Sequence, residues 1–159
     1  MARHTNKRSM QDEAVKEMLE VAEYCVAFDK SKDSRWPGCI GCYGYPAAIM
    51  LLCIADCIGS VVENNGKEYD TKKNFCILNN TEYYNLNLSD CEVEAIRSLY
   101  RNKLSHNAYI GGNCILSIGD DNSPVIKKLP NKKKYMLYLK PLLKITRNVV
   151  DKYLQKQEW

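Results

Sequence analysis

The segment covering residues 47–62 is apolar on nearly every side, and it limits the possible folds of this chain more than any other feature. Pro46 suits the first turn of a helix and the Asn-Asn-Gly at 64–66 suits its end, so we expect a helix over residues 46–63. The apolar run is shorter than the roughly 20 residues that a bilayer span needs. We therefore expect the central, most buried helix of a bundle, and no membrane association.

Asp56 is the one charged residue in this apolar run, where a charge must find a partner. Two interpretations remain open. The carboxylate could form an ion pair with Arg101 from a neighbouring helix and hold that guanidinium in place. Alternatively, it could lie on the one edge of the helix that water reaches. The first interpretation makes Asp56 a supporting residue of a site.

Helical periodicity predicts further helices over residues 10–28 after a Ser9 cap, 71–78, 90–105 and 141–157. Apolar runs at 114–119 and 124–129 predict a β-hairpin, which residues 135–139 could extend. A chain of 159 residues is enough for a single domain over residues 1–159, with residues 1–8 as a disordered basic tail. The expected class is all-α or α-dominant: a bundle of four to five helices with a β-hairpin inserted before the last helix.

No apolar stretch follows the basic N-terminus, so we expect a cytoplasmic protein whose cysteines are reduced. Cys39 and Cys42 have the spacing of a zinc knuckle, which needs two more ligands. The only other candidates are Cys53, Cys57 and His4. We therefore expect no metal and no other cofactor.

The helix predicted over residues 90–105 opens with a capping box formed by Ser89 and Glu92. At about 100° per residue, one apolar stripe forms on this helix and is expected to face the core. Its members are Val93, Ile96, Tyr100 and Leu104. The other side carries small residues, which would let a second helix approach closely. They are Ala95, Ser98 and Ser105.

The same outer side carries Arg101, Asn102 and His106, which form the pattern R-N-x-x-x-H. Asn102 and His106 are four residues apart and share a helix face. Arg101 and His106 differ by about 140° around an ideal helix, so they would not point at one atom. Convergence would need a helix end, the long reach of arginine, or a second copy of the chain.

This arrangement of Arg101, Asn102 and His106 resembles the motif of HEPN domains, a superfamily of small helical domains. Ribonuclease members carry R-x(4 to 6)-H, often with a polar residue directly after the arginine. The resemblance implies a dimer in which two motifs face each other, and RNA cleavage without a metal. It also implies a biological setting, as a toxin or antiphage defence effector with a cognate antitoxin or another regulatory protein.

RNA cleavage without a metal needs a base for the 2′-hydroxyl proton, an acid for the leaving 5′-oxygen and a cation for the phosphorane. One chain offers a single motif histidine, and two chains offer two. We therefore expect a homodimeric endoribonuclease in which His106 transfers protons and Arg101 clamps the phosphate. Asn102 would orient the imidazole or the phosphate.

Tyr109 is a second supporting candidate. One HEPN subgroup, the toxins paired with nucleotidyltransferase antitoxins, carries a tyrosine two residues after the histidine. In this chain Ala108 holds that place and Tyr109 follows it. A function of another class stays open beside the ribonuclease. In that alternative the chain is a non-catalytic helical module that binds RNA, a nucleotide or a partner protein through the same residues.

The basic residues are concentrated in the C-terminal third, where residues 127–156 hold ten lysines and arginines against the single Asp151. The net charge of the whole chain is only +4. Phosphate neutralisation dominates affinity for nucleic acids, so RNA is a sensible partner, although a solvated lysine face would give the same pattern. The candidate RNA-binding residues are Lys103, Lys127, Lys128, Lys132, Lys133 and Lys134.

Overall fold

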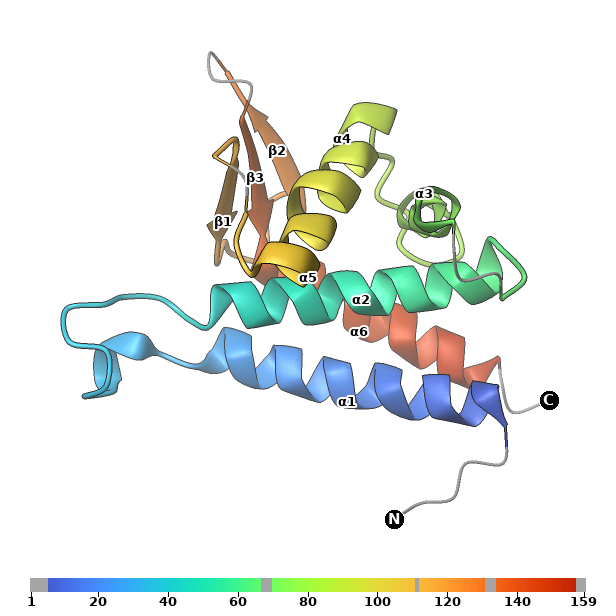
Figure 1. Ribbon diagram of the computed structural model, residues 1–159, viewed down its shortest axis with the longest axis horizontal. Helices are drawn as coiled ribbons and strands as arrows, with labels where there is room; N and C mark the ends of the chain where they lie inside the picture. The colour runs from blue at the N-terminus through green and yellow to red at the C-terminus, as the bar shows by residue number, and fades with distance from the viewer. Residues whose placement is uncertain (1–5, 67–69, 111, 131–133, 157–159) are drawn as a thin grey trace.

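The computed structural model describes residues 6–66, 70–110, 112–130 and 134–156, and this part of the chain is rich in helix (Figure 1). The elements in chain order are α1 (Lys7–Ala27), η1 (Lys30–Lys32), α2 (Gly44–Val62), α3 (Thr71–Asn74), η2 (Phe75–Asn79), α4 (Asp90–Ala95), η3 (Ile96–Asn102), α5 (Lys103–Asn107), β1 (Cys114–Ser117), β2 (Ile126–Leu129), β3 (Lys134–Tyr138) and α6 (Leu139–Gln155). Helices α1 and α2 lie side by side, and α6 crosses behind α2. The expected α-dominant class is confirmed.

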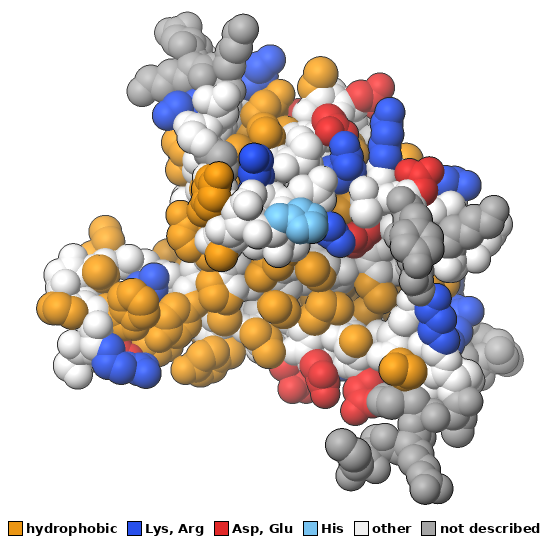
Figure 2. Space-filling model, in the orientation of Figure 1, with side chains coloured by type: hydrophobic (Ala, Val, Ile, Leu, Met, Phe, Trp, Pro, Cys, Tyr) orange, Lys and Arg blue, Asp and Glu red, His pale blue; other side chains and the backbone are white. Residues whose placement is uncertain are grey.

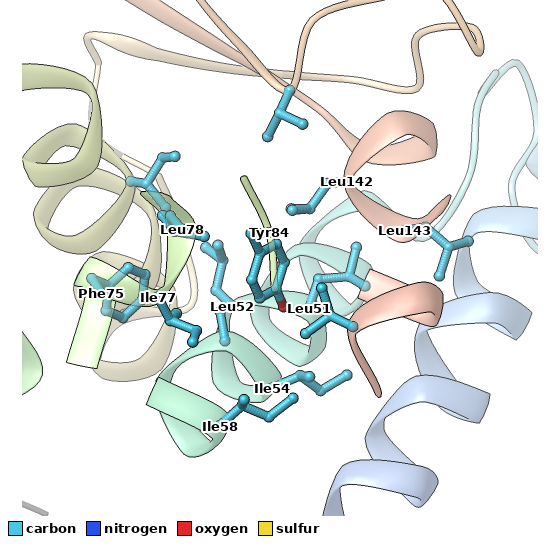
Figure 3. Packing of buried hydrophobic residues seen from close by; sticks show 14 of the residues in the cluster. Leu51, Leu52, Ile54, Ile58, Phe75, Ile77, Leu78, Tyr84, Leu142 and Leu143 are labelled. Atoms are coloured by element: carbon cyan, nitrogen blue, oxygen red, sulfur yellow. The ribbon is translucent and has the colours of Figure 1, made fainter. Parts of the chain in front are cut away.

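Helix α2 is the central helix, as its composition predicts. Its side chains at Leu51, Leu52, Ile54 and Ile58 have no solvent exposure. Figure 3 shows them packed around Tyr84, with side chains from η2 and α6 on either side. By length and composition α2 could also cross a bilayer, but half of its apolar window is buried inside the molecule.

The segment that carries the R-N-x-x-x-H pattern is a helix in three parts. It begins with the predicted capping box, in which Ser89 and Glu92 bond to each other's backbone and side chain. An α-helical turn, α4, leads into the π-helical η3, and α5 completes the helix. Segments of π-helix are rare, and they are frequent at functional sites.

The predicted β-hairpin is wrong in its pairing. β3 lies in the middle of a three-stranded sheet, parallel to β1 and antiparallel to β2, so β1 and β2 do not pair with each other. The turn at residues 120–123 does form, but the chain on both sides of it bonds elsewhere. The carbonyl of Ile118 accepts from the N–H of Lys140, and that of Val125 accepts from Tyr138. The hairpin is therefore made by β2 and β3.

The first helix begins earlier than predicted. Asn6 caps α1, and Ser9 is the third residue of the helix and closes a capping box with Asn6. Lys7 and Arg8 are thus helical, and the proposed disordered tail over 1–8 is wrong for residues 6–8. Residues 1–5 lie outside the described part of the chain. The last helix likewise begins at Leu139, two residues before Pro141.

Candidate functional site

Asp56 and Arg101 form an ion pair, which decides between the two interpretations of Asp56. An Nη2–Oδ2 distance of 2.7 Å joins the guanidinium on η3 to the carboxylate in the middle of α2. The Asp56 side chain is 12% exposed and the Arg101 side chain 22% exposed. The charge in the apolar helix is therefore compensated by a partner rather than by water.

Two buried asparagines extend this ion pair inward. Asn74 of α3 donates its amide to the other carboxylate oxygen of Asp56 at 2.8 Å, and Asn64 donates to the amide oxygen of Asn74 at 3.2 Å. The approach of α3 to α2 depends on Gly59, because a Cβ there would lie 2.0 Å from the carbonyl oxygen of Asn74. A buried relay of polar groups thus fixes the Asp56 carboxylate.

Asn102 completes the set of groups that hold the guanidinium. Its Oδ1 accepts from Nη1 of Arg101 at 3.2 Å. The Nε of Arg101 is buried and has no hydrogen-bond partner among the described residues. Asn102 therefore orients Arg101 in the single chain, where the sequence left open whether it orients the imidazole or a phosphate.

His106 lies in the last turn of α5 and is exposed. In the part of the chain that the structure describes, no hydrogen bond or ion pair reaches its imidazole. The helix end beneath it is anchored by the buried Leu104, which belongs to a cluster with Ala47 and Ala48 of α2. Figure 2 looks onto this face, where the pale-blue histidine lies beside basic and acidic side chains. His106 is thus fixed at its backbone and free at its ring.

Tyr109 follows the helix and is 52% exposed. Ala108 ends α5 in the left-handed conformation, with a φ of 55°, and its N–H bonds to the carbonyl of Leu104. This turn separates Tyr109 from the helix that carries His106. Tyr109 is accessible beside the motif, and among the described residues no hydrogen bond, ion pair or ring contact gives it a supporting role.

The small-residue face predicted for a second helix is only partly present. Ala95 is buried in the main core, at 3% exposure, so it cannot line an outer surface. The hydroxyls of Ser98 and Ser105 each donate a hydrogen bond to a backbone carbonyl one turn earlier in the same helix. Of the three residues only Ser105 is exposed, whereas Ser98 is half-buried.

A different apolar surface lies on the same face as the histidine. A band of hydrophobic side chains runs over α2 below the histidine (Figure 2). On α2, Tyr45 is half exposed and Ile49 partly exposed, and they share one face because they are four residues apart. Val21 and Tyr24 of the adjacent α1 are also exposed.

The candidate RNA-binding lysines occupy two places. Lys127 and Lys128 are exposed on the edge strand β2, and Lys134 begins β3 opposite Leu129. Lys103 is half-buried at the start of α5. Lys132 and Lys133 lie outside the described residues.

The sheet that carries these lysines is tied to the motif helix by Tyr100. Its buried hydroxyl lies 3.0 Å from the carbonyl oxygen of Ile115 in β1 and 2.7 Å from that of Tyr135 in β3. Burial raises the pKa of this phenol well above its ordinary range. The hydroxyl therefore stays a proton donor, and it holds the sheet in a fixed relation to Arg101, its neighbour in the chain.

A cleft of about 230 Å³ opens beside the guanidinium. It is lined by Gln11, Cys53, Asp56, Cys57, Ser60, Asn74 and Arg101. Burial raises the pKa of the Cys53 thiol and raises that of Cys57 to about 11, so both thiols are neutral near pH 7. No group of three or more histidine, cysteine or acidic side chains suited to a metal ion occurs among the described residues.

Sequence reasoning missed Asn74, Asn64 and Gly59. A usable signal was present, because an acid inside an apolar helix requires buried polar partners, and asparagine is one of the residues that can supply them.

Comparisons of this chain with protein-family models, with curated proteins and with solved structures found no match to any of them.

Proposed function

We propose that this protein is a metal-independent endoribonuclease of HEPN type that acts as a homodimer. The observation that carries the proposal is that one helix holds both a fixed cation and an exposed imidazole. Arg101 is held by Asp56 and Asn102, and His106 stands exposed at the end of the same helix. A cation that is positioned before the substrate arrives can stabilise charge that develops on a phosphorane.

The proposed reaction is transesterification. The 2′-oxygen of a ribose attacks the adjacent phosphorus, and its proton passes to the His106 imidazole of one protomer. The bond from phosphorus to the 5′-oxygen breaks, and the leaving oxygen takes a proton from His106 of the partner subunit. The products are a 2′,3′-cyclic phosphate and a free 5′-hydroxyl. The guanidinium of Arg101 binds the phosphate oxygens, for which its planar fork is suited.

The apolar band on α2 supports the second copy. Tyr45 and Ile49 expose hydrophobic surface on α2, and Figure 2 shows a hydrophobic band over α2 on the face that presents the histidine. Surfaces of this kind mark sites of association. Dimerisation there would bring two motifs together. Ile49→Arg is expected to give a monomer by sedimentation and to lose cleavage. A wild-type monomer that still cleaves RNA would refute the shared site.

The lysines of the sheet are proposed to hold the RNA backbone. Lys127→Gln with Lys128→Gln is expected to weaken RNA binding and to reduce the log-log salt slope by up to about two, roughly one for each lost phosphate contact. Turnover at saturating RNA should stay near that of the wild type. An unchanged salt slope would assign these lysines to a solvated face.

The alternative, a non-catalytic module, is favoured by one observation. In the single chain Asp56 and Asn102 already occupy both terminal nitrogens of Arg101. The arginine could then be purely structural, with His106 serving only as a contact. Incubation of the purified protein with total RNA in EDTA separates the two functions. Cleavage by the wild type with none by His106→Ala supports the ribonuclease, and binding without cleavage supports the module.

A further inference from the structure

The chain between α1 and α2 projects beyond the rest of the molecule (Figure 1). We name residues 28–43 the arm. Residues 34–40 are all exposed, and Ile40 is 88% exposed, the largest fraction among the large hydrophobic side chains that the structure describes. The eight residues from Trp36 to Tyr43 carry no charge. The arm therefore presents apolar surface to solvent, and the proposed reaction makes no use of it.

Stacked aromatic rings give the arm a defined shape. Phe28 and Tyr43 stack with their ring centroids 4.2 Å apart, and Trp36 meets Tyr43 edge-on at 5.9 Å. The indole N–H of Trp36 donates to the Tyr43 hydroxyl at 3.2 Å, and the ammonium of Lys30 lies 4.6 Å from the centre of the Trp36 ring. The backbone N–H of Lys30 donates to the carbonyl of Gly41 at 2.9 Å. A surface that is ordered before binding loses little conformational entropy when a partner covers it.

The charges of the arm are largely compensated within the arm. Lys32 pairs with Asp29 at 3.3 Å, and Arg35 pairs with Asp33 at 2.6 Å. The third cation, Lys30, lies over two of the aromatic rings. RNA and anionic membranes are both attracted by an excess of cations, which the arm does not offer. An uncharged, apolar partner surface fits better, because the cores of protein interfaces are depleted in charged residues and enriched in aromatic ones.

The apolar surface of the arm continues onto the face proposed for dimerisation. Figure 2 shows hydrophobic side chains running from the projecting loop into the band over α2. Seven large hydrophobic side chains are exposed in the described part of the chain, and five of them belong to the arm or to the helix turns that flank it, so exposed apolar surface is concentrated here. These five are Val21, Tyr24, Trp36, Ile40 and Tyr45.

A stable dimer needs more surface than the band on α2 offers by itself. Specific interfaces bury about 800 Å² on each partner and involve roughly 20–30 residues a side. The band supplies Tyr45, which is half exposed, and Ile49, which is only partly exposed. The arm adds the indole of Trp36 and the side chain of Ile40. Tryptophan and tyrosine are among the residues that most often contribute large shares of binding energy.

We propose that the arm binds a second copy of this chain, so that the two arms and the two α2 bands form one continuous dimer interface. The proposal rests on the proposed function for the identity of the partner, because the shared site needs a second copy. It goes further by assigning a main contact to residues outside the motif and outside α2. In a symmetric dimer each arm makes the same contact, so Ile40 is buried twice.

Sedimentation measures the dimer dissociation constant of the wild type and of Ile40→Asp. Ile40 is exposed in the single chain, so the substitution should leave the fold intact while it places a charge in the proposed interface. We expect the dissociation constant to rise at least about tenfold, because two carboxylates would be desolvated in each dimer. Met10→Asp is the matched control, at a side chain that is 54% exposed near the start of α1, and should leave the constant unchanged.

The arm contact and the proposed function fail in different ways. A wild-type dimer that Ile40→Asp does not weaken would overturn the arm contact, and cleavage of RNA by that dimer would leave the proposed function standing. A dimer that Ile40→Asp dissociates, but that does not cleave RNA, would support the arm contact and refute the ribonuclease. A monomeric wild type would overturn the arm contact. Sedimentation of that monomer with vesicles of phosphatidylcholine and phosphatidylserine, abolished by Ile40→Asp, would reassign the arm to a membrane surface.

Discussion

The Arg101 side of the motif is enclosed and the His106 side is open. Arg101 lies against α2 with partners on both terminal nitrogens, and the polar relay through Asp56 ends on buried asparagines. His106 has a fixed backbone and an imidazole without a hydrogen-bond partner in the described structure. The difference indicates a division of labour. In the proposed reaction the cation is positioned before any ligand binds, and His106, the proposed proton-transfer group, gains its partner only from substrate or from a second protomer.

The largest expected effect is on RNA cleavage, where the two sides should be equally sensitive. Arg101→Ala and His106→Ala should each reduce the cleavage rate by roughly 10²- to 10⁴-fold, because each removes one positioned group of the reaction. Asn107→Ala, at the exposed neighbour of His106, is the matched control and should keep the wild-type rate. Wild-type cleavage by either variant would show that the site assignment is wrong.

Stability should separate the two sides. Arg101→Ala leaves the Asp56 carboxylate without its ion pair, and loss of one partner of a buried pair costs about 3 kcal/mol. His106→Ala should change the free energy of unfolding by less than about 0.5 kcal/mol, because nothing in the described structure bonds to its ring. Urea unfolding measures both. The ion pair with Asp56 is the reason for the difference between the two variants.

The relay behind Arg101 can be loosened at Asn74. Asn74→Ala removes the bond to Asp56 at 2.8 Å and should cost about 2 kcal/mol, the range for hydrogen bonds to charged groups. If Asn74 positions Arg101 through Asp56, KM for RNA should also rise. Asn148→Ala, on the exposed face of α6, should leave both quantities unchanged. A loss of stability with an unchanged KM would make Asn74 a purely structural residue.

These elements differ in how far the sequence could reveal them. The start of α4 was predictable because a capping box is a local pattern, and the burial of α2 followed from its uniform apolar composition. Asp56 could not be placed, since one acid on an apolar helix fits an inner or an outer position equally. The sheet was mispaired because the turn at 120–123 is local, whereas the parallel pairing of β1 with β3 joins residues distant in the chain.

The His106 side of the motif can be stabilised by a substitution that should not change the rate of the proposed cleavage. Ala108 adopts a left-handed conformation with a φ of 55°, which costs a residue with a Cβ roughly 1–2 kcal/mol relative to glycine. Ala108→Gly should therefore raise the free energy of unfolding by about 1 kcal/mol and keep cleavage unchanged. Ala14→Gly, within α1, should lower it by about the same amount. If Ala108→Gly lowers the free energy of unfolding as Ala14→Gly does, the left-handed conformation of Ala108 is not a source of strain.

The smallest effect concerns the reactivity of the Cys57 thiol, which lines the cleft beside Arg101. Burial raises the pKa of Cys57 to about 11, so at pH 8 its reactive thiolate is scarce. Iodoacetamide should modify the exposed Cys39 first, and Cys57 should react only as the pH approaches 11 or in denaturant. Mass spectrometry of the digested protein gives the order. Rapid modification of Cys57 at pH 8 would mean that the cleft is more open to water than described.

The π-helical segment η3 determines how this site would respond to the loss of a residue. Such a segment holds more residues per turn than the α-helices on either side, so it behaves as a stored insertion. Loss of a single residue from it would let the helix return to regular α geometry and would leave the residues after it close to their present orientation, because the wider turn has already absorbed the extra residue. Arg101 could then keep its ion pair with Asp56 in a chain one residue shorter. The same loss from α4 or α5, which have no wider turn to give up, would rotate the residues after it by about 100°.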